Sequence, residues 1–384
     1  MDLMKGSTSF RSLRKKYDDF SAPSVEVTVG STKLVSGAGA DIFDLELELT
    51  SGFEASGCVF YIDGAYDEKN TDFKKFTDKI QIGESVEIAL GYVRRESVFK
   101  GYINEVEYQY GMEDDRNRIR VECMDAKGLL MKTRRMEIFT QKSADAVVKA
   151  ILGETPVSSY ISGKEIDSCK EEEVPLRSHM MTDYDLIVEQ AQKQGFEFFI
   201  LQGKAYFRKK QKVTSTILTL SPGQGILRAR LSLSGQQLVK KIEIRSIDET
   251  NGKQIKGEAA LSGTFGKGSG YKKLLGDSRQ VFYEPGVQDA AEAKARAQAR
   301  MDQISQRFGE LECECVGIPE LSPGRFVEVD ELSSQADRKY YITYVRHVLS
   351  EDGYRTYIRA GVNSLRMELQ IYFTVKMNIM TISG

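Results

Sequence analysis

The segment Arg177–Arg208, RSHMMTDYDLIVEQAQKQGFEFFILQGKAYFR, carries the signals of one helix followed by one hairpin. Thr182 can cap the helix, and Asp185 stands three residues later, as in an Asp version of the capping box. Gly195 suits the left-handed backbone that ends many helices. The apolar stripe of the helix consists of Tyr184, Ile187, Val188 and Ala191. The first strand of the hairpin alternates at Phe196, Phe198 and Ile200, and the turn lies at Gln202-Gly203. This pattern predicts a mixed α/β unit, to which we assign residues 131–235.

On the N-terminal side of this unit, residues 22–130 are typical of an all-β domain. Apolar residues alternate at Val25, Val27 and Val29, and the run from Phe43 to Leu49 alternates with Asp and Glu, so one face is expected to be buried and the other wet. Five or more short strands separated by turns predict a barrel or a sandwich. Residues 1–21 are charged and aperiodic, and they predict a flexible arm or a segment that becomes ordered only on a partner.

On the C-terminal side, residues 236–364 return to a β pattern, with a helical insertion at 263–309. The insertion holds a glycine-rich loop and an Ala-rich helix, whose apolar stripe is Ala293, Ala297, Met301, Ile304 and Phe308. The tail, residues 365–384, is apolar and β-prone, and such a segment is kept where it pairs with something. The candidate interaction residues in the tail are Leu369, Ile371, Phe373, Val375 and Ile379.

Composition excludes several classes of protein. The chain of 384 residues is 41% hydrophobic and 29% charged, which is ordinary for a globular protein with two or three domains. A net charge of −2 does not indicate a nucleic-acid binder, which would normally carry a basic domain or stripe. There is no run of about 18 apolar residues, so no membrane span is expected. The N-terminal twenty residues have no apolar core of a secretory signal, so we expect synthesis in a cytoplasm and exit by lysis or within a particle.

The five cysteines, Cys58, Cys123, Cys169, Cys313 and Cys315, have no regular spacing and are expected to be reduced thiols. Cys313 and Cys315 lie on one face of a predicted strand, and a metal site would need more ligands than the chain's two histidines supply, so no metal is expected.

Motifs that carry catalysis or cofactor binding are absent or incomplete. The loop GTFGKGSG, Gly263–Gly270, lacks the spacing of a phosphate loop, and GAGAD, Gly37–Asp41, lacks the third glycine of a dinucleotide fingerprint. No G-x-S-x-G nucleophile elbow occurs, and His347 lies in an alternating strand that favours a structural role. We therefore expect no catalytic residues and no cofactor.

Three segments, in order, resemble one protein family. The first is FKGYINEVEYQY followed by RIRVECMDAKGLL, within Phe99–Leu130, in which Gly101 allows the strand to bend or a neighbour to approach closely, and Asp125 can cap the next turn. The second is the Arg177–Arg208 segment, and the third is GIPELSPGRFVEV with YYITYVRHVLSEDGYRTYIRA, between Gly317 and Ala360. They resemble phage late-control D proteins, the baseplate hubs of contractile tails, which are similar to the first part of VgrG-type proteins. Through these three segments the resemblance extends over roughly residues 22–364.

The resemblance implies an architecture and a role. It implies two β-barrel-like domains related by a pseudo-twofold, plus the α/β insert, with three chains forming a pseudo-hexameric ring. Such a homotrimer would adapt a threefold spike to a sixfold inner tube, nucleate tube assembly, and contact baseplate wedge proteins, as a virion component or part of a contractile injection particle. The apolar tail would dock to the spike or thread between protomers. Two alternatives stay open: a hub that carries cargo or an effector in its lumen, and a peptidoglycan hydrolase of the tail tip, which lacks a visible catalytic module.

Overall fold

The computed structural model describes residues 3–111, 117–139, 143–170, 177–248, 251–262 and 270–362. Its main feature is a single mixed sheet of 13 strands in the described part of the chain. The N-terminal strands are β1 (Ser24–Val29), β2 (Thr32–Lys33), β3 (Asp41–Thr50), β4 (Gly57–Asp63), β5 (Ser85–Gly91), β6 (Arg95–Gln109) and β7 (Arg118–Met124). The C-terminal strands are β13 (Thr216–Pro222), β14 (Gly225–Leu233), β18 (Gly309–Val316), β19 (Phe326–Val329), β20 (Arg338–Ser350) and β21 (Gly353–Val362).

The C-terminal strands close into a barrel of six, because β19 pairs with both β13 and β20 in the order β19-β13-β14-β18-β21-β20. The molecule is therefore mainly β, as the sequence predicts. The extent of this domain differs from the expectation, because β13 and β14 come from the range that we assigned to the insert. The sequence of that range indicates a strand that ends at a Pro-Gly turn, but local signals do not indicate which strand pairs with it. The partners are β19 for β13 and β18 for β14, and both follow much later in the chain.

The N-terminal strands follow the order β3-β4-β7-β6-β5-β1-β2, and no pairing joins β1 back to β3 in the described residues. This half is consequently an open, curved sheet. Taken in chain order, β3, β4, β5, β6 and β7 occupy the same places as β14, β18, β19, β20 and β21 in the barrel, with the same antiparallel pairing between neighbours. The two halves are an internal repeat in topology. They differ in their first strand, since β1 runs antiparallel to β5 whereas β13 runs parallel to β19.

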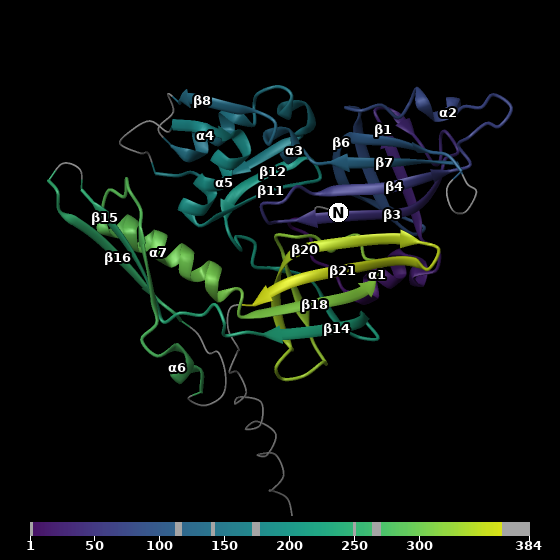
Figure 1. Cartoon of the computed structure of the whole chain (residues 1–384). Coiled ribbons are helices and arrows are strands. Elements are labelled where there is room, and N and C mark those ends of the chain that lie inside the picture. Colours follow the sequence, from purple (N-terminus) through teal and green to yellow (C-terminus); the bar gives the residue numbers. More distant parts are fainter. Residues whose placement is uncertain are drawn as a thin grey trace, which may run out of the picture.

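The two halves meet strand to strand. Residues Tyr344–Leu349 of β20 pair antiparallel with Leu45–Thr50 of β3, so one ladder runs from β14 to β6 without a break. Figure 1 displays this series from β6 near the top to β14 at the bottom. A single hydrophobic core contains residues of both halves, among them Leu47 of β3 and Val345 of β20, each fully buried. The β structure is therefore one body rather than two domains on a linker.

Alternation along the strands explains this packing. In β3, Leu45, Leu47 and Leu49 are buried while Glu46 and Glu48 stand on the other face. At one position the backbones come so close that only glycine fits: a Cβ on Gly101 in β6 would lie 2.1 Å from the carbonyl oxygen of Met124. The predicted close approach at Gly101 is confirmed.

The N-terminal segment differs from the expected flexible arm. It forms α1 (Phe10–Lys16) and the 3₁₀ turn η1 (Asp18–Phe20), with Phe10, Leu13 and Tyr17 buried in the common core. The guanidinium of buried Arg325 donates to the carbonyl oxygens of Leu3 (2.8 Å) and Gly6 (2.9 Å). The many charges of this segment obscured its few apolar residues, which lie on one face only when the segment forms a helix.

The insert is a small α/β unit with its own core. Its elements are α3 (Lys127–Leu130), β8 (Arg134–Ile138), α4 (Ala144–Ile151), η2 (Val157–Tyr160), β9 (Gly163–Ile166), β10 (Arg177–Thr182), α5 (Asp183–Gln194), β11 (Phe196–Leu201) and β12 (Lys204–Lys209), while the short α2 (Lys74–Thr77) lies in the β4–β5 connection. The predicted capping box is confirmed: Thr182 Oγ1 accepts from the Asp185 amide at 3.0 Å, and the Asp185 carboxylate accepts from the Thr182 amide at 3.1 Å. The predicted stop is confirmed too, because Gly195 has φ 66°.

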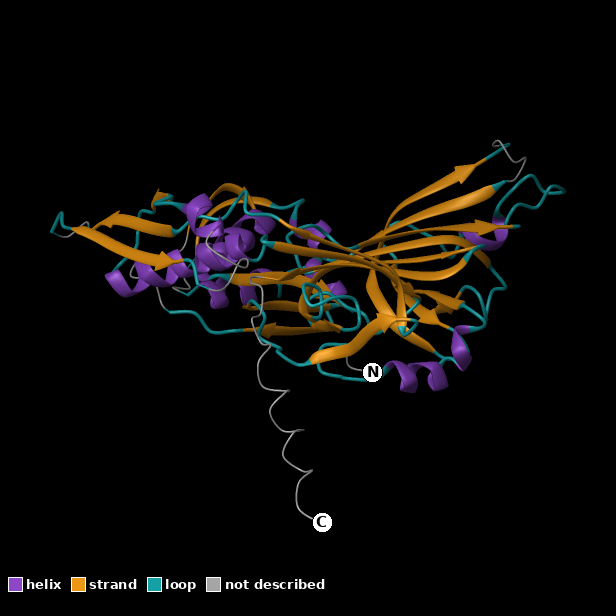
Figure 2. Cartoon of the chain, turned by 90° about the horizontal axis from the view of Figure 1, so that it is seen from below, coloured by secondary structure: helices purple, strands orange, loops and turns teal. Residues whose placement is uncertain are grey.

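A second small unit projects from the barrel, built from β15 (Lys241–Ile247), β16 (Gln254–Ala260), α6 (Gly270–Leu275), β17 (Arg279–Tyr283) and α7 (Ala290–Ser305). Its order is β16-β15-β17, and Ala293, Ala297 and Met301 of α7 pack on Ile242 and Ile244 of the sheet. The stripe expected for this helix is confirmed at these positions. Strands β15 and β16, which we expected in the second β domain, instead belong with this insertion. Figure 2 shows most helices gathered at the end of the molecule that carries the insert, with the long strands at the other.

Candidate assembly surfaces

The side chains that leave the eight-strand series from β14 to β6 on its wet face are mostly charged. They form cross-strand pairs: Arg230 with Glu312 (3.7 Å), Arg355 with Glu314 (3.9 Å), Arg346 with Glu46 (3.0 Å) and Arg120 with Glu107 (3.9 Å). Pairs of opposite charge on facing strands stabilise a sheet modestly, each by roughly 0.2–1 kcal/mol. We call this surface the charged face. The alternation of Glu46 with Glu48 and of Glu312 with Glu314 could have identified it from the sequence, but not its continuity across both halves.

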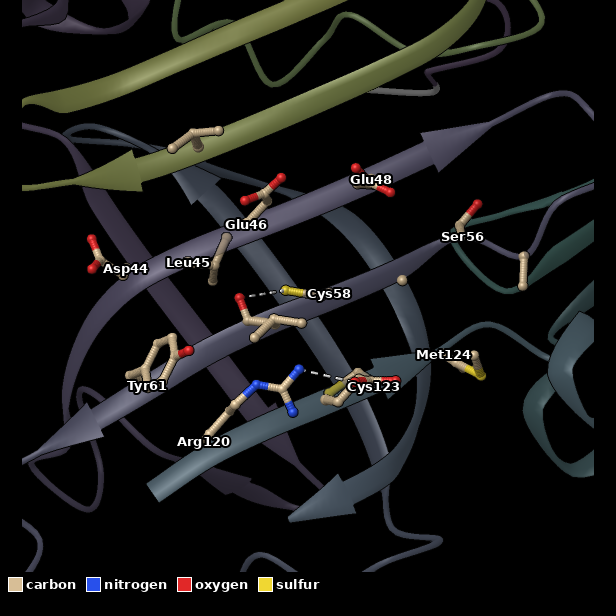
Figure 3. Close-up of a pocket in the computed structure, with 15 residues that line it drawn as sticks. Asp44, Leu45, Glu46, Glu48, Ser56, Cys58, Tyr61, Arg120, Cys123 and Met124 are labelled. Atoms are coloured by element: carbon tan, nitrogen blue, oxygen red, sulfur yellow. Dashed lines mark hydrogen bonds and ion pairs between the residues drawn. The ribbon is translucent and has the colours of Figure 1, made fainter. Parts of the chain in front are cut away.

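A shallow hollow of about 610 Å³ lies on this face over β3, β4 and β7. Figure 3 shows Glu46, Glu48, Tyr61 and Arg120 standing around it. Arg120 is held among carboxylates, with Glu122 at 3.1 Å and Glu105 and Glu107 at 3.9 Å. Cys58 and Cys123 are buried beneath the hollow, and burial raises the pKa of the Cys123 thiol, so neither is poised as a thiolate. The groups around the hollow are suited to ion pairing and hydrogen bonding.

The sequence candidates for chemistry are placed inside the core. His347 is fully buried; its Nδ1 lies 2.9 Å from the Tyr354 hydroxyl and 3.1 Å from that of Thr356, and burial lowers the pKa of His347 to about 3. Cys313 and Cys315 are buried on one face of β18, with their sulfur atoms 3.5 Å apart. No group of three or more His, Cys, Asp or Glu side chains suited to a metal ion occurs in the part of the chain that the structure describes. Gly263–Ser269 of the glycine-rich loop lie outside the described residues.

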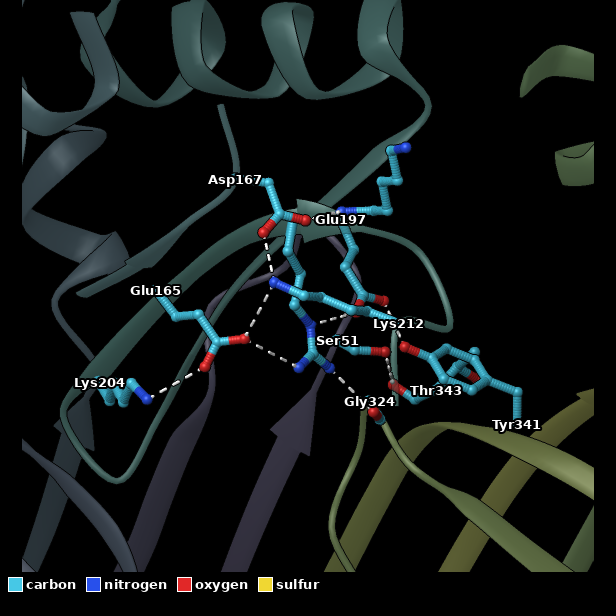
Figure 4. Close-up of polar contacts among 11 residues, drawn as sticks. Ser51, Glu165, Asp167, Glu197, Lys204, Lys212, Gly324, Tyr341 and Thr343 are labelled. Carbon is cyan, nitrogen blue, oxygen red and sulfur yellow. Dashed lines mark hydrogen bonds and ion pairs between the residues drawn. The ribbon is translucent and has the colours of Figure 1, made fainter. Parts of the chain in front are cut away.

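A buried polar cluster fastens the insert to the barrel. Arg208 of β12 is fully buried and donates to the Glu197 carboxylate (2.9 Å) and to the Gly324 carbonyl oxygen (3.0 Å). Glu197 also accepts a hydrogen bond from the hydroxyl of Tyr341 in β20. Burial raises the pKa of Glu197, and the neighbouring guanidinium opposes that effect. Figure 4 shows Glu165, Glu197, Gly324 and Tyr341 gathered from the two units. The cluster makes the position of the insert depend on a specific set of donors and acceptors.

A comparable polar cluster, which we call the N-terminal seal, joins the N-terminal segment to both halves of the β structure. The Tyr17 hydroxyl donates to Glu320 at 2.7 Å, and Lys16 bridges Glu320 (2.7 Å) and Glu96 (2.6 Å). Glu320 is fully buried and belongs to the connection before β19, while Glu96 is in β6. Burial raises the pKa of the Tyr17 hydroxyl, which therefore remains a donor.

Exposed apolar side chains occur away from these two polar clusters. Met136 and Ile138 of β8 and Met180 of β10 are 71%, 65% and 73% exposed on the outside of the insert. Leu233, which ends β14, and Tyr110, which follows β6, lie at the two ends of the eight-strand series. The interaction residues expected in the tail, Leu369, Ile371, Phe373, Val375 and Ile379, lie outside the described residues. None of the described helices is long and apolar enough to cross a membrane.

Comparison with solved structures finds the same fold in tail proteins. The 43 kDa tail protein of prophage MuSo2 from Shewanella oneidensis has a TM-score of 0.67 at 15% identity, over 88% of this chain and 98% of that chain. A tail protein from Neisseria meningitidis MC58 has a TM-score of 0.68 at 13% identity, over 89% of this chain and 97% of that chain. A component of the type VI secretion system of E. coli, described as structurally similar to T4 bacteriophage tail proteins, has a TM-score of 0.56 at 13% identity, over 87% of this chain and 76% of that chain.

These likenesses establish the fold of the chain as that of phage tail proteins. The comparison with curated protein sequences gives no match. A family model described as the Alg8 N-terminal domain matches residues 56–351, well over half of the chain, and the chain therefore belongs to this family.

Proposed function

We propose that the chain is a structural hub of a contractile tail or injection particle, in which three copies form a ring. The observation that carries this proposal is the repeat of five strands in one order within one continuous sheet. Three chains with two similar halves offer six similar units to a sixfold tube while keeping threefold symmetry for a spike. The function is mechanical: the ring joins the tube to the spike and turns over no substrate.

Two further findings support this proposal. The solved structures of the same fold are named as tail proteins or as a type VI secretion component. The three sequence segments that resemble late-control D proteins fall on β6–β7, α5–β12 and β19–β21, which include part of the repeat and the buried residues Glu197, Arg208 and Tyr341. The matching family has a different description, so the late-control D assignment remains a proposal. The proposed partners are further copies of the chain, a spike protein, an inner tube protein and baseplate wedge proteins.

The tail extends the proposal to the spike. The apolar residues between Leu369 and Ile379 are proposed to dock on the spike or to thread between protomers. Deletion of residues 365–384 is expected to abolish spike binding without changing the fold of the rest. Full spike binding by the deleted protein would remove the tail from the mechanism.

A hub that carries cargo is the second candidate, and the charged face favours it. If that face lines a lumen, its paired arginines and glutamates offer a cargo protein a polar wall with few apolar contacts. Cargo bound there would be released by salt, because exposed ion pairs are screened.

The decisive experiment is the solution mass of the full chain by light scattering, combined with negative-stain class averages. Three chain masses and a ring with a central hole are the expected result, and addition of tube protein should then extend the ring into a tube. If the chain stays a monomer both alone and with its spike protein, the hub proposal is wrong.

A further inference from the structure

Two strand edges in the eight-strand series have no backbone partner among the described residues. Strand β5 pairs with β6 only as far as Tyr102, which leaves the same edge of β6 open from residue 104 to 109. Strand β13 meets β14 only at Gly225 and Ile226, which leaves that edge open from residue 228 to 233. Open edges are templates for pairing with another chain unless they are blocked.

The internal repeat tells which part of the molecule each open edge resembles. Strand β20 pairs with β19 up to Tyr341, has a bulge between Ile342 and Tyr344, and then pairs with β3. Strand β6 has the same bulge between Ile103 and Glu105. The backbone agrees in detail: the amide of Gly324 donates to Ile342 at 2.9 Å, and that of Gly83 donates to Ile103 at 2.9 Å. Residues 104–109 therefore correspond to residues 343–348 of β20, most of which pair with β3.

The open edge of β14 corresponds in turn to the edge of β3 that pairs with β20. Leu47 of β3 faces Cys58, whose other neighbour is Cys123 of β7. Leu231 of β14 faces Leu311, whose other neighbour is Ala360 of β21. Cys123 and Ala360 are equivalent because they face Ile103 and Ile342. Leu231 thus occupies the place of Leu47, and Arg230 that of Glu46.

We propose that β6 of one chain pairs antiparallel with β14 of a second copy, and that this joint repeats the β20–β3 joint of each chain. Carrying over the register of β20 and β3 places Glu107 opposite Ser232 and Tyr108 opposite Leu231. The joint rests on the proposed hub function, which it deepens by naming the surfaces that meet. It joins two different edges, so it is a head-to-tail contact of the kind that closes into a ring.

Charge supports this pairing. Within the chain, Arg346 of β20 and Glu46 of β3 form an ion pair of 3.0 Å across the joint. The equivalent positions are Glu107 in β6 and Arg230 in β14, so the pair is conserved between the joints with its signs exchanged. Among the residues that the structure describes, Glu107 and Arg230 have only longer ion pairs, 3.9 Å to Arg120 and 3.7 Å to Glu312. The new joint gives each of them a closer partner.

Exposure supports it as well. Leu233 is 42% exposed and Tyr110 is 59% exposed. The residue of β3 equivalent to Leu233 is Leu49, which is 1% exposed because β20 covers it. Pairing with a second copy would cover Leu233 and Tyr110 in the same way, and it would extend the charged face from one chain to the next without a gap.

Charge reversal tests the joint. Glu107→Arg and Arg230→Glu should each raise the protein concentration at half-assembly by about tenfold or more, since like charges then meet at every joint. The double variant should restore assembly to within about threefold, because each joint regains one acid and one base. Glu310→Arg, an exposed residue of β18 on the same face but inside the series, is the matched control and should leave assembly unchanged.

Cross-linking tests the register independently of charge. A chain with Glu107→Cys and Ser232→Cys should form disulfide-linked multimers on mild oxidation, because directly paired positions lie within bridging distance. A chain with Glu107→Cys and Arg230→Cys should cross-link poorly, because diagonal neighbours are about 7–8 Å apart. Circular dichroism on each variant confirms that the fold is retained.

The outcomes separate the joint from the hub. A wild-type trimer that neither charge reversal weakens, or that cross-links equally in both cysteine chains, overturns this joint and leaves the hub standing. A wild-type chain that stays monomeric at every concentration and with its spike protein overturns both.

Discussion

The two halves of the β structure share an order of strands, yet only the C-terminal half closes on itself. In the barrel, β19 bridges β13 and β20, whereas in the N-terminal half β1 ends the sheet with only the two residues of β2 beyond it. The long strands β20 and β6 show the same contrast. Beyond its bulge β20 pairs with β3 instead of β19, whereas β6 beyond its bulge no longer pairs with β5 and has no other strand on that edge among the described residues. One strand position is therefore filled inside the chain in one copy of the repeat and open in the other, and the open position is where we propose that a further chain pairs.

The largest effect is expected where the insert meets the barrel. Arg208→Ala leaves the buried Glu197 carboxylate without its cation, and breaking a buried pair in this way costs about 3–5 kcal/mol. Denaturant unfolding measures this loss, and Lys209→Ala, an exposed neighbour, should change the free energy of unfolding by less than about 0.5 kcal/mol. Equal effects from both variants would show that the cluster does not fasten the insert.

The equivalent leucines Leu47 and Leu231 lie at the closed joint and at the open edge, respectively, so their substitution tests the difference between the two. Leu47→Ala should lower the free energy of unfolding by about 2–5 kcal/mol, because Leu47 is fully buried between β20 and β4. Leu231→Ala should cost the monomer less, because Leu231 is only partly buried at an open edge, but it should weaken assembly. The two measurements are chemical denaturation and light scattering. A Leu231→Ala monomer that is destabilised as much as the Leu47 variant would argue against the open edge.

The barrel half has an imidazole at a position where the N-terminal half has a phenol, because His347 of β20 occupies the place that Tyr108 has in β6. The pKa of His347 is lowered to about 3, so the unfolded chain binds a proton below about pH 6.5 that the folded chain does not. Stability should therefore fall as the pH decreases from about 6.5 toward 3, by about 1.4 kcal/mol per pH unit from this residue. Denaturation of wild type and His347→Gln between pH 7 and 4 isolates this contribution. An unchanged slope in the variant would assign the dependence to other groups.

The smallest of these effects is expected at the N-terminal seal. Tyr17→Phe removes one donor to the buried Glu320 carboxylate but leaves Lys16 in place, so a loss of about 1–3 kcal/mol is expected. Thermal unfolding measures it, with Tyr283→Phe, at an exposed position of β17, as the control. If limited proteolysis removes residues 1–20 from the folded protein at no cost in stability, this segment is not part of the seal.

The local elements of secondary structure could be predicted from the sequence alone. Alternation predicted β1 and β3 and the β character of residues 22–130 and 236–364, the capping residues fixed both ends of α5, and the apolar spacing marked the buried stripe of α7. These signals are local, because they depend on the period of a strand or helix and on backbone groups within one turn. The glycine spacing argued against a phosphate loop, and the alternating strand around His347 favoured a structural role for that residue.

Which strands pair and which edges stay open could not be predicted from these local signals. The placement of β13 and β14 in the barrel, the β20–β3 joint, and the burial of Arg208, Glu197 and Arg325 depend on contacts between residues far apart in the chain. An isolated strand has the same alternation whether its edge faces another strand or water, so periodicity cannot distinguish a closed barrel from an open sheet. That difference is set by long-range hydrogen bonding, and it is this difference that locates the proposed contact between copies of the chain.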